Sequence, residues 1–368
     1  MADPLLFVSA GDPSGDNATS RVIDGLKEKR PGLKLYGLGG KRLAALGQEQ
    51  LANPSDLAVL GFWEVARRFM YFRRLLRRCV AEIEDRRPRA VLLVDYPGFN
   101  LRLARRIRQL GIPTIYYISP QVWAWGKGRL RQIHDYVDKM LVILPFEESF
   151  YREHGVPCKF VGHYLLEDIP SDYIGSPLPS NGRLALLPGS RRQEIERMLP
   201  VMLEAAAMLN RKHGCMSVVA GIKGVYDYDA VCKSYSGKGV EVSYDDPRKT
   251  IYESELVLIA SGTATLETGI IGRPMVVVYK TGFLTYQIAR RLVKLDSIAL
   301  VNLVLGEKVV PELIQSRATG ESMAAALERY LIDDSYRDKT LTELNHVPSL
   351  LGGRGATERT AEVLAEYL

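Results

Sequence analysis

The sequence predicts an α/β protein built from two similar halves that face one cleft. Each half opens with a short apolar run, a glycine-containing turn and a helix: residues 5–15 read LLFVSAGDPSG, and residues 184–195 read LALLPGSRRQEI. Such an arrangement points backbone N–H groups and the positive end of a helix dipole at an anion. Two openings about 180 residues apart in a chain of 368 residues therefore indicate two domains of ordinary size.

Composition is that of a well-packed globular chain, with 46% hydrophobic and 25% charged residues. Its four cysteines, at positions 79, 158, 215 and 232, form no C-x-x-C pair. We therefore expect unpaired thiols in a reducing compartment and no metal site. The first residues run into a strand without a signal-peptide pattern, and no run approaches the ~18 apolar residues of a spanning helix. A cytoplasmic protein with at most peripheral membrane contact is expected.

The domain boundary is predicted from residues 169–182, which are rich in Pro, Ser and Gly and lack periodicity. The first domain is expected over residues 1–168 and the second over residues 169–345. A terminal helix over residues 356–368 carries apolar side chains at helical spacing. This helix is expected to return to the first domain.

The first half holds a candidate catalytic acid. Residues 90–94, AVLLV, read as a buried parallel strand, and Asp95 follows at its carboxyl end, where α/β folds bind ligands. The next helix is expected to begin near Phe99 and Asn100, several residues later. That spacing favours a working carboxylate over a helix N-cap at Asp95.

Residues 61–78, GFWEVARRFMYFRRLLRR, combine an apolar helical stripe with six arginines. One interpretation is a helix that packs on the core. The other is an interfacial helix whose aromatic side chains enter the headgroups while its arginines bind anionic lipid. Nucleic acid would accept the charge, but no nucleic-acid-binding module is recognisable. The predicted membrane-contact residues are Phe62, Trp63, Phe69, Met70, Phe72, Arg73, Arg74 and Arg77.

The second half carries the features of a nucleotide-sugar pocket. Arg191 lies in its opening turn, so a phosphate there would meet a fixed charge as well as backbone amides. The strand LVLIAS ends in a turn of small residues, 261–263, which suits a pyrophosphate or a sugar at a helix N-terminus. Glu267 follows one helical turn later, where a carboxylate can accept hydrogen bonds from ribose hydroxyls. Asn302 is expected in a loop between two apolar runs.

Six motifs, in this order, resemble the lipid-A-disaccharide synthase family: AGDPSGD, VDYPGFN, YYISPQVWAW, LLPGSR, SGTATLE and LVNLVLGEKVVPELIQ. The resemblance spans almost the whole chain and implies the GT-B fold, in which two Rossmann-like domains face a central cleft. One position departs from the family pattern G-E-x-S-G-D, because Asp12 stands where the family has Glu. The shorter side chain changes the contacts that this acid can make.

The resemblance implies an inverting glycosyl transfer that needs no metal or other cofactor. UDP-2,3-diacylglucosamine would be joined to 2,3-diacylglucosamine 1-phosphate in a β(1→6) linkage, and UDP would leave. Asp95 would be the general base, Arg191 would stabilise the departing UDP, and Ser14 and Asn302 would complete the catalytic site. The implied UDP-sugar site comprises Gly189, Ser190, Arg191, Ser261, Gly262, Thr263, Thr265, Glu267 and Tyr279.

The resemblance also implies a place in lipopolysaccharide synthesis for the Gram-negative outer membrane. The expected partners are the two acylated sugars and the anionic surface of the inner membrane, with no nucleic acid; a homodimer is compatible with the sequence. Two alternatives remain. A UDP-N-acetylglucosamine 2-epimerase would bind the same nucleotide but would have little use for the segment 61–78. A non-catalytic lipid-binding protein would leave Asp95, Arg191 and Glu267 without a role.

Overall fold

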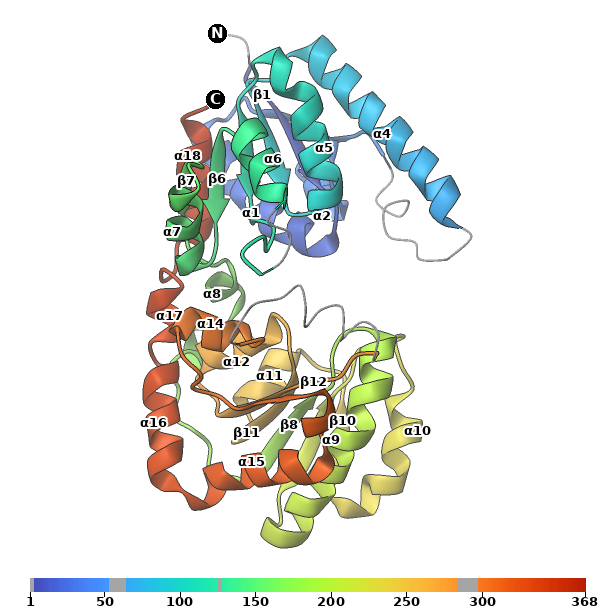
Figure 1. The fold of residues 1–368 in the computed structure, drawn as a ribbon, viewed down its shortest axis with the longest axis vertical. Coiled ribbons are helices and arrows are strands. Elements are labelled where there is room, and N and C mark those ends of the chain that lie inside the picture. The colour runs from blue at the N-terminus through green and yellow to red at the C-terminus, as the bar shows by residue number, and fades with distance from the viewer. Residues whose placement is uncertain (1–2, 53–63, 125–127, 283–296) are drawn as a thin grey trace. The chain divides into compact units, whose positions relative to one another are not determined.

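The computed structural model describes residues 3–52, 64–124, 128–282 and 297–368, and for 64–69, 236 and 238 it describes the backbone only (Figure 1). The chain divides into two compact units. Unit 1 comprises Met1–Tyr164 and Gly352–Leu368, and unit 2 comprises Leu165–Leu351. Each unit has its own parallel sheet and its own hydrophobic core.

Within the described residues, unit 1 contains a seven-stranded parallel sheet of order β3-β2-β1-β4-β5-β6-β7. Its central strands are fully buried because helices cover both faces, as the continuous apolar runs in the sequence predict. The strands are β1 (Leu5–Ala10), β2 (Lys34–Leu38), β3 (Glu49–Gln50), β4 (Ala90–Val94), β5 (Thr114–Tyr117), β6 (Lys139–Val142) and β7 (Cys158–Phe160). The helices are α1 (Pro13–Lys29), α2 (Lys41–Ala45), α4 (Glu64–Arg86), α5 (Pro97–Ile107), α6 (Gly128–Tyr136), α7 (Pro145–Glu153) and α18 (Ala356–Ala365).

Unit 2 repeats this plan with a parallel sheet that, over the part of the chain described, has the order β10-β9-β8-β11-β12-β13. The strands are β8 (Arg183–Leu187), β9 (Met216–Ala220), β10 (Val240–Ser243), β11 (Leu256–Ala260), β12 (Met275–Tyr279) and β13 (Glu312–Ile314). The helices are α8 (Leu165–Asp168), α9 (Arg192–His213), α10 (Tyr228–Cys232), α11 (Pro247–Tyr252), α12 (Ala264–Ile271), α14 (Leu300–Leu305), α15 (Gly320–Ile332), α16 (Asp334–Leu344) and α17 (Val347–Leu350).

The terminal helix α18 returns to unit 1 and packs against α1, which confirms the prediction for residues 356–368 (Figure 1). The two helices lie close together at Gly25 of α1, where an added Cβ would lie 3.9 Å from the Cβ of Ala361. The Arg359 guanidinium donates to the Val161 carbonyl at 2.8 Å, and Arg30 donates to the Ala365 carbonyl at 3.1 Å. These bonds attach the end of the chain to the unit in which it began.

Two local expectations are wrong. Helix α5 begins at Pro97 rather than near Phe99, because proline suits the first helical position, where its missing N–H has no partner to lose. Asn302 lies in helix α14 and not in a loop. The apolar residues around it are buried against α12 and α17, and that packing favours a helix over an exposed connection.

Candidate active site

Asp95 lies at the carboxyl edge of the unit 1 sheet, beside the end of the neighbouring strand. Ala10 pairs with Val94, so the turn after β1 and the turn after β4 are adjacent. Asp95 and Tyr96 both adopt left-handed backbone conformations, with φ of 43° and 46°. A Cβ at Gly11 would lie 2.7 Å from the Tyr96 ring, so glycine is required there.

Three buried side chains hold this strained turn in place. Asn100 donates to the carbonyl of Asp95 at 2.8 Å and to that of Val94 at 3.0 Å. Ser9 donates to the Asn100 side-chain oxygen at 2.7 Å, and the Tyr116 hydroxyl also donates to the Asp95 carbonyl. A non-glycine residue in the left-handed region costs about 1–3 kcal/mol and persists where its surroundings over-determine it. The protein therefore maintains strain at the residue predicted to be the base.

The environment of Asp95 suits a proton acceptor. Burial, and then the negative charge of Asp12, raise the pKa of its carboxyl; the Tyr96 N–H partly opposes both, and the pKa lies at about 6 instead of 3.8. A base with a pKa near the working pH combines a large ionised fraction with a high proton affinity. Asp12 itself caps α1 by accepting from the Gly15 N–H at 2.7 Å. Sequence reasoning had placed no role on Asp12 beyond its departure from the family motif.

Ser14 is exposed in the first turn of α1, where its hydroxyl lies 3.4 Å from the Tyr164 hydroxyl. Asp16, further along the same helix, is buried and accepts from the N–H groups of Gly40 at 2.7 Å and Leu43 at 3.2 Å. This carboxylate thereby stabilises the start of α2. Of the two residues, only Ser14 is exposed; its catalytic role stays a prediction.

Unit 2 contains a cavity of about 390 Å³ where the sequence predicts the nucleotide pocket. Ile259 of β11 pairs with Leu187 of β8, so the turns that follow these strands lie side by side. The cavity joins seven residues of the predicted UDP-sugar site: Gly189, Ser190, Arg191, Ser261, Gly262, Thr263 and Glu267. Eight further residues that line it were not predicted as site residues: Leu187, Glu194, Ala220, Ile222, Pro247, Ile259, Ala260 and Ala264.

An arginine that the sequence reasoning missed holds Glu267. The Arg248 guanidinium donates to Glu267 at 2.8 Å and lies 3.7 Å from Asp168. Arg248 belongs to the first turn of α11, which the Asp246–Pro247 pair begins at the carboxyl end of β10. The Asp246–Pro247 pair is a helix start that the sequence shows. It could have been used to predict that Arg248 lies at the carboxyl edge of the sheet.

A carboxylate already occupies the amides expected to bind phosphate. Glu194 accepts from the N–H groups of Ser190 at 3.3 Å and Arg191 at 3.4 Å, and from the Arg191 guanidinium at 2.7 Å. Glu194 is the third residue of α9 and accepts from the N–H of the N-cap residue Arg191, which is the glutamate half of a capping box. A nucleotide phosphate would have to displace this carboxylate.

Three other predicted residues do not line the cavity. Thr265 is fully buried and donates to the Gly262 carbonyl at 2.8 Å, so it shapes the turn. Tyr279 is 37% exposed at the end of β12. Asn302 is buried and donates to Glu312 at 2.8 Å; Glu312 in turn accepts from the N–H of Ile298 at 2.9 Å. Direct substrate contacts by these residues stay predictions.

The basic segment 61–78 falls partly outside the described residues, which exclude Phe62, Trp63 and the side chain of Phe69. Met70 is 44% exposed, and Arg73, Arg74 and Arg77 are exposed. Leu75, by contrast, is buried in the core, and the Phe72 ring packs 6.3 Å from the Phe99 ring. One face of α4 therefore packs on the protein while another is exposed and basic. In the part of the chain that the structure describes, no helix is long and apolar enough to cross a membrane.

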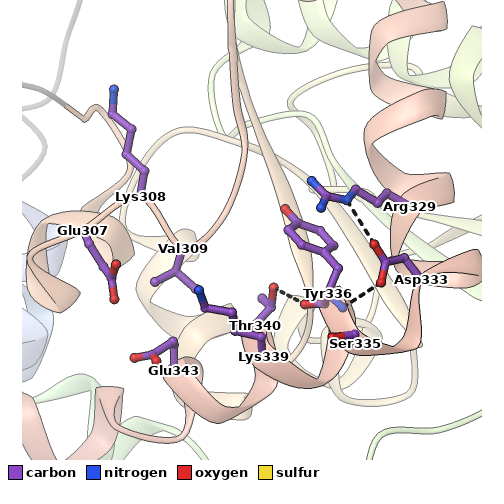
Figure 2. A pocket seen from close by; sticks show the side chains of 10 residues that line it. All are labelled: Glu307, Lys308, Val309, Arg329, Asp333, Ser335, Tyr336, Lys339, Thr340 and Glu343. Atoms are coloured by element: carbon purple, nitrogen blue, oxygen red, sulfur yellow. Dashed lines mark hydrogen bonds and ion pairs between the residues drawn. The ribbon is translucent and has the colours of Figure 1, made fainter.

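A further hollow in unit 2 has a volume of about 370 Å³ and is lined by α15, α16 and the segment after α14; Figure 2 shows its lining side chains. Arg329 lies 3.5 Å from Asp333, and its guanidinium stacks 3.7 Å from the centre of the Tyr336 ring. The hollow contains none of the predicted site residues. Its acidic and basic side chains balance, so its charge selects neither an anion nor a cation: Glu307, Asp333 and Glu343 against Lys308, Arg329 and Lys339.

Comparison with known proteins gives a match over almost the whole chain, including both sheets and all six motifs. The family model described as lipid-A-disaccharide synthetase matches residues 6–364. The chain belongs to this family. It is 39% identical to the lipid-A-disaccharide synthase of Myxococcus xanthus and 43% identical to that of Anaeromyxobacter dehalogenans. The alignments cover 99% and 98% of this chain, and 98% and 97% of the two relatives. The activity is accordingly that of a glycosyltransferase of lipid A biosynthesis.

Solved structures confirm the GT-B fold. The UDP-GlcNAc 2-epimerase of Neisseria meningitidis, solved with UDP-GlcNAc bound, superimposes with a TM-score of 0.60 at 12% identity. This match covers 98% of this chain and 99% of the epimerase. The calicheamicin glycosyltransferase CalG4 gives a TM-score of 0.62 at 16% identity, over 100% of this chain and 98% of CalG4. At such low identity the likeness concerns the fold alone, and the epimerase alternative gains no support from it.

Proposed function

We propose that this family member joins UDP-2,3-diacylglucosamine to 2,3-diacylglucosamine 1-phosphate and releases UDP, with Asp95 as the general base. The observation that carries the proposal is the carboxyl of Asp95. It lies at the carboxyl edge of the sheet on a strained turn held by Asn100 and Tyr116, and its pKa is raised to about 6. Strain and a shifted pKa concentrate at functional sites.

In the proposed reaction Asp95 accepts the proton of the acceptor 6-hydroxyl. The hydroxyl oxygen attacks the anomeric carbon of the donor sugar as the bond from that carbon to the UDP oxygen breaks. A single displacement on the face opposite UDP inverts the configuration to β. Negative charge grows on the leaving diphosphate, where Arg191 and the amides of residues 261–263 would stabilise it. Arg248 holds Glu267 within the same cavity, where its carboxylate would bind the ribose.

The reaction is tested by measuring UDP release from UDP-2,3-diacylglucosamine with and without 2,3-diacylglucosamine 1-phosphate. We expect release to require the acceptor and a disaccharide 1-phosphate to accumulate in equal amount. Acceptor-independent conversion of the nucleotide sugar would favour the epimerase alternative. Failure to bind UDP in calorimetry would favour a non-catalytic lipid-binding protein.

The turn that holds Asp95 gives a prediction with a matched control. Tyr116→Phe removes one hydrogen bond to the Asp95 carbonyl, and Tyr151→Phe removes one to the Pro120 carbonyl. Both tyrosines are fully buried, so each variant should lose about 1 kcal/mol of stability in chemical denaturation. Only Tyr116→Phe should lower turnover, by roughly 3–10-fold, because only its bond positions the base. Equal turnover in both variants would contradict a positioning role.

We further propose that the protein attaches peripherally to an anionic membrane through the exposed part of α4. Met70 offers apolar surface beside the exposed arginines of the helix: Arg73, Arg74 and Arg77. Apolar insertion together with basic residues is how peripheral helices bind anionic lipid. Both proposed substrates carry acyl chains, so attachment would bring the enzyme to them.

Serine substitutions separate the membrane role from the packing role. Met70→Ser should leave the melting temperature unchanged and reduce co-sedimentation with anionic vesicles by several-fold. Phe72→Ser should lower the melting temperature, because its ring packs against Tyr96 and Phe99 in the core of unit 1. Met216→Ser is the control, since Met216 is 52% exposed in unit 2 and outside the segment. Equal vesicle binding by the two methionine variants would exclude Met70 from the interface.

A further inference from the structure

An apolar groove of about 500 Å³ runs between helices α4 and α5 of unit 1. Its floor consists of four side chains: Phe72, Leu76, Tyr96 and Phe99. The three rings form one cluster, with the Tyr96 and Phe99 rings stacked 6.2 Å apart and the Phe72 ring 6.3 Å from each. This floor accepts hydrocarbon, because its surface consists of aromatic and aliphatic side chains.

The groove begins next to the proposed base. Tyr96 directly follows Asp95 and contributes its ring to the groove floor. The strained turn therefore has two consequences: it sets the position of the Asp95 carboxyl and directs the Tyr96 ring against Phe72 and Phe99. The groove therefore includes the residue that follows the proposed base in the chain.

Arginines line the other side of the groove. Arg102 and Arg106 are four residues apart on α5, so they project from the same helix face, and both are exposed. Among the described residues neither forms an ion pair, although Arg102 donates to the Gly98 carbonyl at 2.7 Å. Two uncompensated guanidinium groups beside an apolar floor match an amphiphile that carries both hydrocarbon and phosphate.

We propose that this groove binds one acyl chain of the acceptor, and that Arg102 and Arg106 bind the acceptor's phosphate. The inference rests on the proposed function and extends it to the acceptor subsite. It selects the acceptor over the donor for two reasons. The acceptor carries a phosphate monoester that arginine pairs can bind, and its hydroxyl must approach Asp95, which precedes the groove residue Tyr96.

Gly98 allows the groove to be filled without disturbing the fold. It lines the groove in the first turn of α5, and a Cβ added there would meet no atom within 4 Å. Gly98→Leu should therefore fold normally and exclude the chain. Each buried methylene contributes about fourfold in affinity, so the KM for a long-chain acceptor should rise at least about tenfold. The KM for a short-chain acceptor and the affinity for UDP should remain within about twofold.

Gly128→Leu is the matched control. Gly128 begins α6, outside the groove, and a Cβ there also meets no atom within 4 Å. Its kinetics should be those of the unaltered protein. Arg106→Gln tests the proposed contact with the phosphate. It should raise the KM for the phosphorylated acceptor several-fold and leave the KM for an acceptor without phosphate unchanged.

The outcomes separate this inference from the proposed function. If the unaltered protein formed no disaccharide, the proposed function would fail. If it did, and Gly98→Leu kept the normal KM for the long-chain acceptor, the groove assignment alone would be overturned. Reduced vesicle binding of Gly98→Leu with a normal acceptor KM in detergent micelles would assign the groove to membrane lipid and would also overturn the inference.

Discussion

Asp95→Asn is expected to lower turnover by at least about 100-fold while UDP affinity stays within a few-fold. Asparagine keeps the size and much of the hydrogen bonding of aspartate but cannot accept the proton, and general bases contribute about 10²–10⁴-fold. Steady-state kinetics at saturating acceptor, together with UDP calorimetry, measure the two quantities. Near-normal turnover would exclude Asp95 as the base.

The same variant should become more stable at neutral pH. The folded pKa of Asp95 is raised from 3.8 to about 6, so ionisation disfavours the folded state. Stability therefore falls as pH rises from about 4 to 6, by up to roughly 3 kcal/mol. Asparagine avoids this cost, so Asp95→Asn should melt higher than the unaltered protein at pH 7, and the advantage should shrink toward pH 4. A lower melting temperature at pH 7 would contradict it and would leave misfolding as the cause of lost turnover.

The raised pKa also predicts a pH profile. Turnover should fall as pH drops through about 6, because the protonated carboxyl cannot accept a proton. Asp12→Asn should move this acidic limb to lower pH, since it removes a negative charge near Asp95. Asparagine remains a good N-cap for α1, so the fold should be preserved. An unmoved limb would mean that Asp12 does not act on the base.

Arg191→Ala and Glu267→Ala are each expected to weaken UDP binding by roughly 10–100-fold. Each removes a charged hydrogen-bonding partner from the cavity of unit 2, and such partners contribute about 1.5–3 kcal/mol. Arg191→Ala should also lower turnover, because the negative charge on the leaving diphosphate is greater in the transition state than in the bound substrate. Calorimetry with UDP measures the affinity, and Arg197→Ala, at an exposed position of α9, is the control.

A variant of Glu194 should change UDP affinity in the opposite direction. Its carboxylate occupies the amides and the guanidinium that the phosphate would need. Glu194→Gln removes the negative charge yet can still accept from the Arg191 N–H at the start of α9, so UDP should bind several-fold more tightly. If UDP affinity were unchanged in this variant and in both alanine variants, the pocket would lie elsewhere.

Local patterns in the sequence predicted the parts of this site that short stretches of chain build. The strand, turn and helix around Gly189–Arg191 and around residues 261–263 form from neighbouring residues, so their sequence spacing could be interpreted directly. The same holds for Asp95, because an apolar run that ends in a charged residue identifies the carboxyl end of a strand. Six motifs in order then indicated the family, and the family model over residues 6–364 confirmed it.

The contacts between distant segments could not be predicted in this way. Ser9, Asn100 and Tyr116 meet at the Asp95 turn only because β1, β4 and β5 pair in one register. No periodicity reports which strands are neighbours. The bond between Arg248 of α11 and Glu267 of α12 likewise depends on how these two helices pack together in the folded chain.

Helix α4 shows most directly that sequence spacing does not predict which apolar side chains are buried. Helical spacing placed its apolar side chains on one face. A face that packs on the core and a face that enters lipid show the same spacing of apolar residues. Leu75 is buried and Met70 is exposed, five residues apart on one helix, because α5 covers only part of its surface. The burial of a side chain depends on which element packs over it, and that is a property of the folded chain.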